Sequence, residues 1–440
     1  MNPPPPLPQE LIDLIIDFLH DDRLTLARCM LVCHRWLDRS RLHLFRDAYV
    51  TVPASEPFAM EQQEPEFKAH NLEAFIAFLE RDASMSLRLA VHYLLIRGLY
   101  PRSNCILPLQ RVSAVLNLLP RLRSLSLLGV RLSSDVSFRN SLSTLSTFHS
   151  LDRLSMSDVT ASPRGSTNKR PILDLFSLFT SINTLFVNDF YAGRTDTDPL
   201  DDLSEKVHVA ALQAIRLRDF DLLQAIFSRA IRLDGVTSFT CTITQTEHIL
   251  SARSLLFALC SDTLTHLEFD LRWFEHEHEE VWERMNLTLL KSLRTFRLHL
   301  ALSTRQELDV SIWTSTIALL SRFSNLELTH LVLHIYVGPC LSNEQDQLQV
   351  TPASAPSQRL QLLDWERFIR LIDAMSTLRS VTFHVAFQID FDSPDLLARR
   401  LGQEDYRQID NLIKSKLDDG GRGRRVQSSW QQCTWETLEA

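Results

Sequence analysis

The sequence contains few glycines, only 10 among 440 residues, and this scarcity disfavours most nucleotide-binding loops. Loops that wrap phosphate groups need glycine because their backbone must approach the phosphate closely. Neither GxGxxG nor GxxxxGK[ST] occurs, and the GxSxG and HExxH patterns of hydrolases and metalloproteases are also missing. We therefore expect a protein that is not an enzyme, with no catalytic residues and no cofactor of its own.

Cysteine, long apolar runs and positive charge are also in short supply. The seven cysteines are an odd number, are widely scattered and form no CxxC pair, which favours reduced thiols over a disulfide framework. No run approaches the roughly 18 apolar residues of a membrane span, and the opening MNPPPPLPQE does not resemble a signal peptide. The formal net charge of -8 argues against nucleic-acid binding. These features predict a cytoplasmic or nuclear protein that binds neither membranes nor nucleic acid.

The most informative stretch of the chain lies near its N-terminus. Seven of the nine residues from Leu11 to Leu19 are apolar, so a helix here is apolar around most of its circumference and needs burial on more than one side. Pro8 suits a first helical turn and Glu10 complements the helix dipole, so we expect the helix to begin near Pro8. A second apolar set from Leu24 to Trp36 predicts one or two further short helices.

A domain of about 40 residues usually needs disulfides, metals or a partner to supplement its core. A protein partner is the natural source of burial here. The same stretch resembles the F-box in the order of its Leu-Pro, Glu, paired aliphatic and Val-Cys-basic-x-Trp elements. The matching segments are Leu7-Pro8-x-Glu10-Leu11-Ile12, Ile15-Ile16, Phe18-Leu19, Leu26, Cys29 and Val32-Cys33-His34-Arg35-Trp36. Residues 39–45 resemble the continuation found in large fungal F-box families.

This resemblance implies docking to the adaptor subunit of a cullin-RING ubiquitin ligase, partly by direct contact and partly through a small internal core. The sequence does not separate the two roles. The implied adaptor-binding residues are Leu7, Pro8, Glu10, Leu11, Ile15, Leu19, Leu26, Val32, Cys33 and Trp36. The alternative is an ordinary helical hairpin at the start of a larger domain. Cys29 and Cys33, one helical turn apart, are interpreted as buried packing residues.

From about residue 71 the chain repeats one theme, in which a short apolar strand is followed by a polar loop and an amphipathic helix. The predicted strands centre on Leu94, Leu125, Leu154, Leu185, Ile215, Cys241, Leu267, Phe296, Leu331 and Val381. Helices are predicted at 112–119, 172–179, 222–231, 249–260, 281–290, 312–323 and 365–375. Most strand spacings lie close to the roughly 20–29 residues of a leucine-rich repeat.

The apolar positions i, i+3 and i+5 resemble a degenerate leucine-rich repeat without its regular asparagine. Each strand and helix would expose an apolar face that only the next unit covers, so stacking predicts an α/β solenoid with parallel strands on its concave face. The alternative is a non-repetitive α/β domain. We expect an F-box within 1–50 (about 7–45), a linker at 51–70, the solenoid at 71–400, and a helix with a flexible tail at 401–440.

One candidate metal site is the cluster Trp273-Phe274-Glu275-His276-Glu277-His278-Glu279-Glu280. A structural zinc site needs four ligands, and spacing supplies no third or fourth ligand beyond the two histidines. We interpret the cluster as a solvated acidic segment and expect no metal.

The resemblance as a whole implies the substrate-recognition subunit of an SCF-type cullin-RING ubiquitin ligase. The F-box would dock the adaptor and, through it, the cullin, while the solenoid would bind a client protein. The alternative from another class is a non-catalytic solenoid scaffold unrelated to ubiquitin.

Overall fold

The computed structural model describes most of the predicted elements. The residues described are 7–53, 70–99, 105–135, 137–138, 149–161, 170–188, 206–215, 227–259, 262–272, 285, 287–302, 306–323, 327–337, 363–388, 407–408, 410–415, 417 and 425–433. The cluster at 273–280 and most of the linker at 51–70 lie outside this set. The chain divides into unit 1, residues 1–210 and 225–232, and unit 2, residues 211–224 and 233–440.

Unit 1 begins with three helices, which we call the N-terminal module: α1 (Gln9–Phe18), α2 (Arg23–Cys29) and α3 (His34–Leu44). The first helix follows Pro8, as predicted. The second begins at a side-chain cap, because the Asp22 carboxylate accepts a hydrogen bond from the Thr25 backbone N–H at 3.0 Å. Side-chain capping of this kind satisfies a backbone donor that has no partner inside the helix.

The remainder of unit 1 is a parallel sheet with helices on one face. Its strands follow the order β2-β1-β3-β5-β7-β8-β9, and β10 pairs with β9. Their bounds are β1 Asp47–Val52, β2 His70–Asn71, β3 Tyr93–Gly98, β5 Ser124–Leu128, β7 His149–Ser157, β8 Phe179–Asn188, β9 Val207–Ile215 and β10 Ile231–Arg232; a small separate sheet pairs β4 Ile106–Pro108 with β6 Arg131–Ser133. The helices are α4 Leu72–Leu79, α5 Met85–Arg88, α6 Leu109–Leu118 and α8 Arg170–Phe176.

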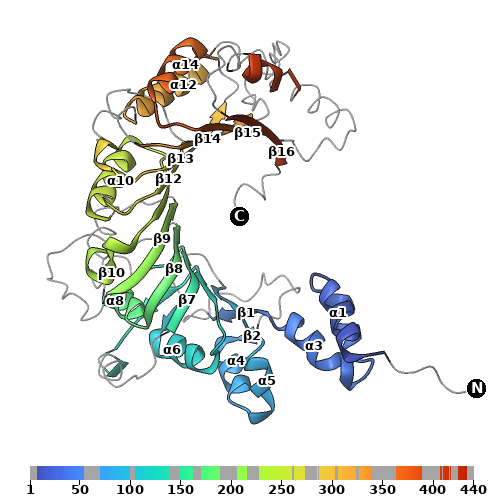
Figure 1. The fold of residues 1–440 in the computed structure, drawn as a ribbon. Helices are drawn as coiled ribbons and strands as arrows, with labels where there is room; N and C mark the ends of the chain where they lie inside the picture. Colours follow the sequence, from blue (N-terminus) through green and yellow to red (C-terminus); the bar gives the residue numbers. More distant parts are fainter. Residues whose placement is uncertain are drawn as a thin grey trace, which may run out of the picture. The chain divides into compact units, whose positions relative to one another are not determined.

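Unit 2 continues the same theme. Its strand order is β9-β11-β12-β13-β14-β15-β16, and every pair is parallel. The bounds are β11 Ser238–Thr242, β12 His266–Asp270, β13 Thr295–Leu302, β14 His330–Val337, β15 Ser380–Gln388 and β16 Arg425–Cys433, with helices α10 Thr246–Leu259, α12 Gln306–Ser321 and α14 Trp365–Ala374. Outside the N-terminal module, the longer helices of each unit lie along one side of the sheet (Figure 1).

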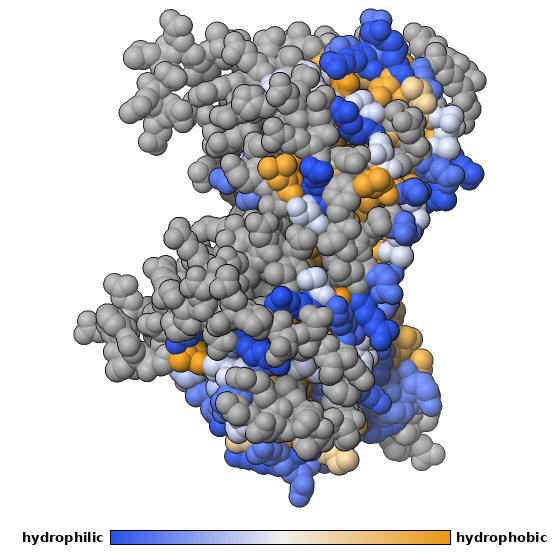
Figure 2. Space-filling view, turned by 90° about the vertical axis from the view of Figure 1, so that its left-hand side faces the viewer, coloured by the Kyte–Doolittle hydropathy of each residue, from blue (hydrophilic) through white to orange (hydrophobic). Residues whose placement is uncertain are grey.

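Along each strand, successive side chains point to opposite faces of the sheet. On β3, Leu94 and Ile96 are buried toward the helices, whereas Tyr93 and Arg97 are exposed on the opposite side, which we call the open face. Phe296 and Phe323 extend the core of unit 2, with ring centroids 4.5 Å apart. The side viewed in Figure 2 is largely hydrophilic among the described residues, with apolar residues in small groups.

The central residue of each of the ten predicted strands lies in a strand. Predicted helices are confirmed at α6, α8, α10, α12 and α14, although residue 179 begins β8 rather than ending a helix. Half of each of the predicted helices at 222–231 and 281–290 lies outside the described residues. In the described halves, residues 227–230 are helical, Ile231 begins β10, and Leu287–Leu289 form a 3-10 turn. Among described helices, no candidate is long and apolar enough to cross a membrane.

The C-terminal segment differs from the expectation. Residues 410–415 are helical, as predicted, but a flexible tail is wrong for Arg425–Cys433, which form β16. This strand pairs in parallel with β15 over its whole length, from Ser380 opposite Arg425 to Gln388 opposite Cys433. The sequence of β16 is mostly polar, so its pattern does not predict a strand. The strand forms through backbone pairing with β15, which does not require apolar side chains.

Gly98 and Gly129 lie close together at the ends of two neighbouring strands, where a side chain would not fit or would be strained. A Cβ atom on Gly98, at the end of β3, would lie 2.1 Å from the carbonyl oxygen of Gly129. Gly129 itself follows β5 with a φ of +63°, a conformation that favours glycine. The close approach of the two strand ends therefore depends on glycine at both positions.

Candidate functional site

The helix α1 has two apolar stripes, of which one is buried and the other is exposed. Ile12 and Ile16, one turn apart, are buried at 4% and 0% exposure. The other stripe stays open to solvent, with Leu11 exposed by 46%, Ile15 by 41% and Phe18 by 80%. Spacings of three and four residues place these side chains on one helix face. We call Leu7, Leu11, Leu14, Ile15 and Phe18, all exposed, the α1 stripe.

The internal core of the N-terminal module is small. Ile12, Ile16 and Leu26 are buried together, and Leu19, Trp36 and Leu44 pack against them while partly exposed. Three of the predicted adaptor-binding residues, Leu19, Leu26 and Trp36, therefore belong to this core. The others, Leu7, Pro8, Glu10, Leu11, Ile15, Val32 and Cys33, are exposed.

The loop between α2 and α3 adds a second exposed apolar group. Leu31 is exposed by 85% and Val32 by 62%. The interpretation of Cys29 as buried is confirmed, but it is wrong for Cys33, which is exposed. Cys33 is the N-cap residue of α3 and has an extended backbone, so it does not share a helical face with Cys29.

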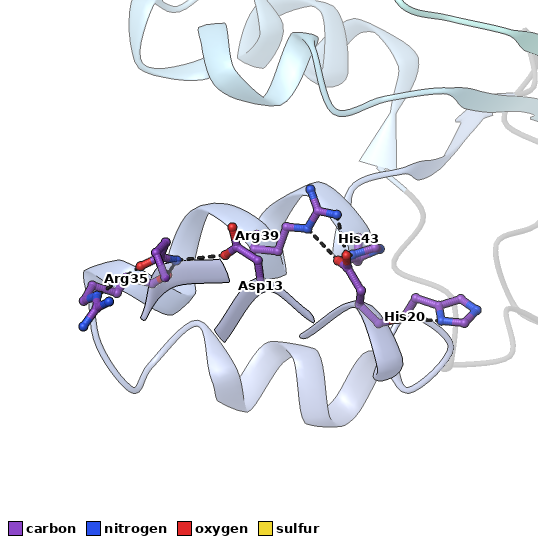
Figure 3. Close-up of polar contacts among 7 residues, drawn as sticks. Asp13, His20, Arg35, Arg39 and His43 are labelled. Carbon is purple, nitrogen blue, oxygen red and sulfur yellow. Dashed lines mark hydrogen bonds and ion pairs between the residues drawn. The ribbon is translucent and has the colours of Figure 1, made fainter. Parts of the chain in front are cut away.

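Polar contacts fix α1 against α3 (Figure 3). The Arg39 guanidinium donates to both Asp17 carboxylate oxygens, at 2.5 and 2.6 Å, and His43 Nε2 lies 2.7 Å from the same carboxylate. The Arg39 hydrogen bond lowers the pKa of Asp17 to about 2, against the opposing effect of burial and with further help from His43. The carboxylate is thus charged at neutral pH and links the two helices.

A second clamp holds the start of α1. Arg35 Nη2 donates to the Leu7 carbonyl at 2.7 Å, and Gln9 Nε2 donates to the Arg35 carbonyl at 2.8 Å. Since Val32 and Cys33 immediately precede α3, these bonds bring the Leu7 end of the α1 stripe close to the exposed loop. The sequence pattern missed Leu14, Phe18, Leu24 and Leu31 as exposed residues, although the spacing of Leu14 and Phe18 already matched that of Leu11.

The exposed apolar side chains of the N-terminal module lie close together. Large contiguous apolar patches on soluble proteins usually mark interaction sites. A module with four buried apolar side chains and so many exposed ones gains stability when a partner covers the exposed set. Chemically, the arrangement can bind another apolar surface.

A row of polar side chains crosses the face of the unit 2 sheet that the helices do not cover. The rings of His299 and His334 stack with centroids 4.3 Å apart, and His334 stacks on His384 at 4.6 Å. His299 Nε2 lies 2.8 Å from a Glu268 carboxylate oxygen, and its Nδ1 lies 3.1 Å from the Tyr336 hydroxyl. Sequence reasoning missed this row, because its members are 35 and 50 residues apart. Among described residues, no group of three or more His, Cys, Asp or Glu side chains is arranged to hold a metal ion.

Burial, and then the neighbouring His299, His384, Arg297 and Arg272, lower the pKa of His334 to about 3. An unfolded chain takes up a proton at this histidine near pH 6.5, whereas the folded chain does not. Stability from this site is therefore fully present above pH 6.5 and is lost as the pH falls toward 3.

We expect His334→Gln to reduce the loss of unfolding free energy between pH 7 and pH 5 by about 1 kcal/mol, allowing for solvent screening. Urea unfolding at both pH values measures the difference. The control is His266→Gln, an exposed histidine on β12, which should keep the wild-type pH dependence. An unchanged pH dependence in His334→Gln would contradict the assignment.

Comparison with known proteins adds no identification. No protein-family model matches the chain, and no curated protein matches it significantly. The candidate site thus depends on the residues and geometry described above.

Proposed function

We propose that this chain is the substrate-recognition subunit of an SCF-type cullin-RING ubiquitin ligase. The N-terminal module would be an F-box that binds the adaptor, and the α1 stripe would provide the contact. The single observation that carries the proposal is this stripe, which lies opposite the module's own core and stays exposed.

The rest of the chain would be a degenerate leucine-rich-repeat-like solenoid that holds a client protein. Parallel strands in nearly sequential order, with helices along one face in each unit, are the arrangement that stacked repeats produce. Bringing a client close to the ubiquitin donor accelerates transfer by proximity, so the chain itself needs no catalytic group. Its localisation would be cytoplasmic or nuclear.

Co-elution of the purified full chain with the purified adaptor subunit tests the proposal. We expect a stable complex in size-exclusion chromatography, with a dissociation constant measurable by calorimetry. A folded chain that fails to bind the adaptor would refute the F-box assignment and favour a scaffold unrelated to ubiquitin.

A further inference from the structure

A pocket of about 560 Å³ opens in unit 1, between the end of the N-terminal module and the first strands of the sheet. Figure 3 shows two of its residues, His20 and His43, at the same end of the helices. The pocket is lined by His20, Asp21, Arg23, His43, Arg46, Asp47, Ala48, Tyr49, Tyr93, Leu94, Leu95, Ser124 and Ser126. Neither the module nor the sheet forms it alone.

Arginines stacked on aromatic rings define the walls of the pocket. The Arg23 guanidinium lies 5.5 Å from the centroid of the Tyr49 ring, and Arg46 lies 5.4 Å from that of Tyr93. Stacking restrains a guanidinium plane and leaves the N–H groups at its edges able to donate. Arg23 already uses one of them, because its Nη2 donates to the Asp47 carbonyl at 3.2 Å. These edges match the two oxygens of a carboxylate, so the arginines are prepared for bidentate binding of acidic groups.

The same pattern continues along the open face. Arg153 on β7 is aligned with Tyr93 through Ser124 of β5, and its guanidinium lies 5.2 Å from the Phe186 centroid. Arg97 is also exposed on this face. The row therefore extends the cationic character of the pocket across neighbouring strands.

Charge on this surface is net positive although the whole chain carries -8. The pocket and the adjoining row together carry four arginines, Arg23, Arg46, Arg97 and Arg153, and three carboxylates, Asp21, Asp47 and the exposed Asp152 beside Arg153. The Asp21 carboxylate is already paired with His20 at 3.0 Å. A polyphosphate such as nucleic acid is disfavoured by these carboxylates and by the overall charge, whereas a short segment with a few carboxylates is complementary.

The floor between the arginines is made of small polar side chains. Ser124 and Ser126 of β5 line the pocket, and Ser155 of β7 is aligned with Ser126. Serine hydroxyls both donate and accept hydrogen bonds, so they can pair with the backbone of an extended segment. Small side chains also leave room for that backbone to lie close to the sheet.

We propose that this pocket and the adjoining row bind an acidic, extended peptide segment of the client protein. The proposal rests on the client-binding function proposed above and specifies the chemical class of the client. Tyr93 and Arg153 lie two strands apart, which is about 10 Å at the usual strand spacing. An extended peptide in the polyproline II conformation rises about 3.1 Å per residue and returns every third side chain to the same face. It therefore covers that distance in about three residues, and carboxylates at positions i and i+3 fit the two arginines Arg46 and Arg153.

Fluorescence anisotropy with the full chain tests this proposal. The probe is a labelled ten-residue peptide of Gly, Ala and Ser with two Glu residues at i and i+3. We expect saturable binding that weakens with added salt, and a loss of about tenfold or more when both Glu are replaced by Gln. Moving the two Glu to adjacent positions should also weaken binding.

Variants of the chain locate the site. Arg46→Gln and Arg153→Gln should each weaken peptide binding about tenfold. Arg46→Lys keeps the positive charge but loses the bidentate geometry of the guanidinium, so its peptide affinity should lie between those of the wild type and Arg46→Gln. The matched control is Arg370→Gln, an exposed arginine on α14, which should bind like the wild type. Circular dichroism confirms that each variant is folded.

Three results would overturn the proposal: equal binding of the Glu and Gln peptides, no effect of the Arg46 and Arg153 variants, or binding only when phosphoserine replaces both Glu. Adaptor binding is measured on the same preparations. A chain that binds the adaptor but not the peptide refutes the client class alone, whereas a chain that fails to bind the adaptor refutes the proposed function.

Discussion

The double variant Leu11→Asp with Ile15→Asp is expected to lose adaptor binding by at least about 100-fold while remaining folded. Both side chains lie on the α1 stripe and are exposed by 46% and 41%. Removing two central apolar contacts of an interface typically costs about 2 kcal/mol each, and burying two carboxylates against an apolar partner adds to that loss. Calorimetric titration of the adaptor measures the effect.

The control for this variant is Met85→Asp, which changes another exposed large apolar residue, on α5, outside the module. It should bind the adaptor with wild-type affinity. Thermal unfolding should be similar for all three proteins, since none of the changed side chains is in the core. Wild-type affinity in the double variant would show that the α1 stripe is not the docking surface.

Trp313→Ala is expected to lower the unfolding free energy of unit 2 by about 4 kcal/mol, as large aromatic truncations in cores do. Trp313 on α12 is 1% exposed. Its ring lies 5.3 Å from that of Trp365 and 5.1 Å from that of Phe368, both on α14. The substitution therefore leaves a cavity between two helices that cover the sheet, and urea unfolding followed by circular dichroism detects the loss.

Arg370→Ala, on the exposed side of α14, is the matched control and should change stability by no more than about 0.5 kcal/mol. Adaptor binding should survive Trp313→Ala at temperatures where unit 1 stays folded, because the α1 stripe belongs to unit 1. A Trp313→Ala chain as stable as the wild type would contradict the packing described here.

Local pattern was sufficient to predict ten of the described strands. Leu94, Leu125 and Leu154 each begin a run of alternating apolar residues, and each lies in a strand paired with the next. Alternation survives in the folded protein because one face of each strand is buried under helices. The signal fails where burial is not required, as in β16, whose polar sequence forms a strand by pairing with β15.

The sequence did not predict which apolar residues of the N-terminal module are buried and which are exposed; the tertiary structure was needed for that. Seven apolar residues between Leu11 and Leu19 predict a helix with more than one apolar side, but not which side the chain itself covers. That depends on where Leu26 and Trp36 pack, and they pack on Ile12 and Ile16. Cys33 was assigned wrongly for the same reason, because the chain leaves helical geometry at this residue.

By itself, the sequence determined the positions of ten of the described strands, most of the described helices and the apolar character of the N-terminal module, because these depend on periodicity within about ten residues. Only the tertiary structure decided what depends on pairing distant segments. Such features are the exposure of the α1 stripe, the approach of Gly98 to Gly129, the histidine row of unit 2, and the meeting of Arg46 with Tyr93 in the pocket. Parallel strands bring residues tens of positions apart into one row, and no local pattern records that register.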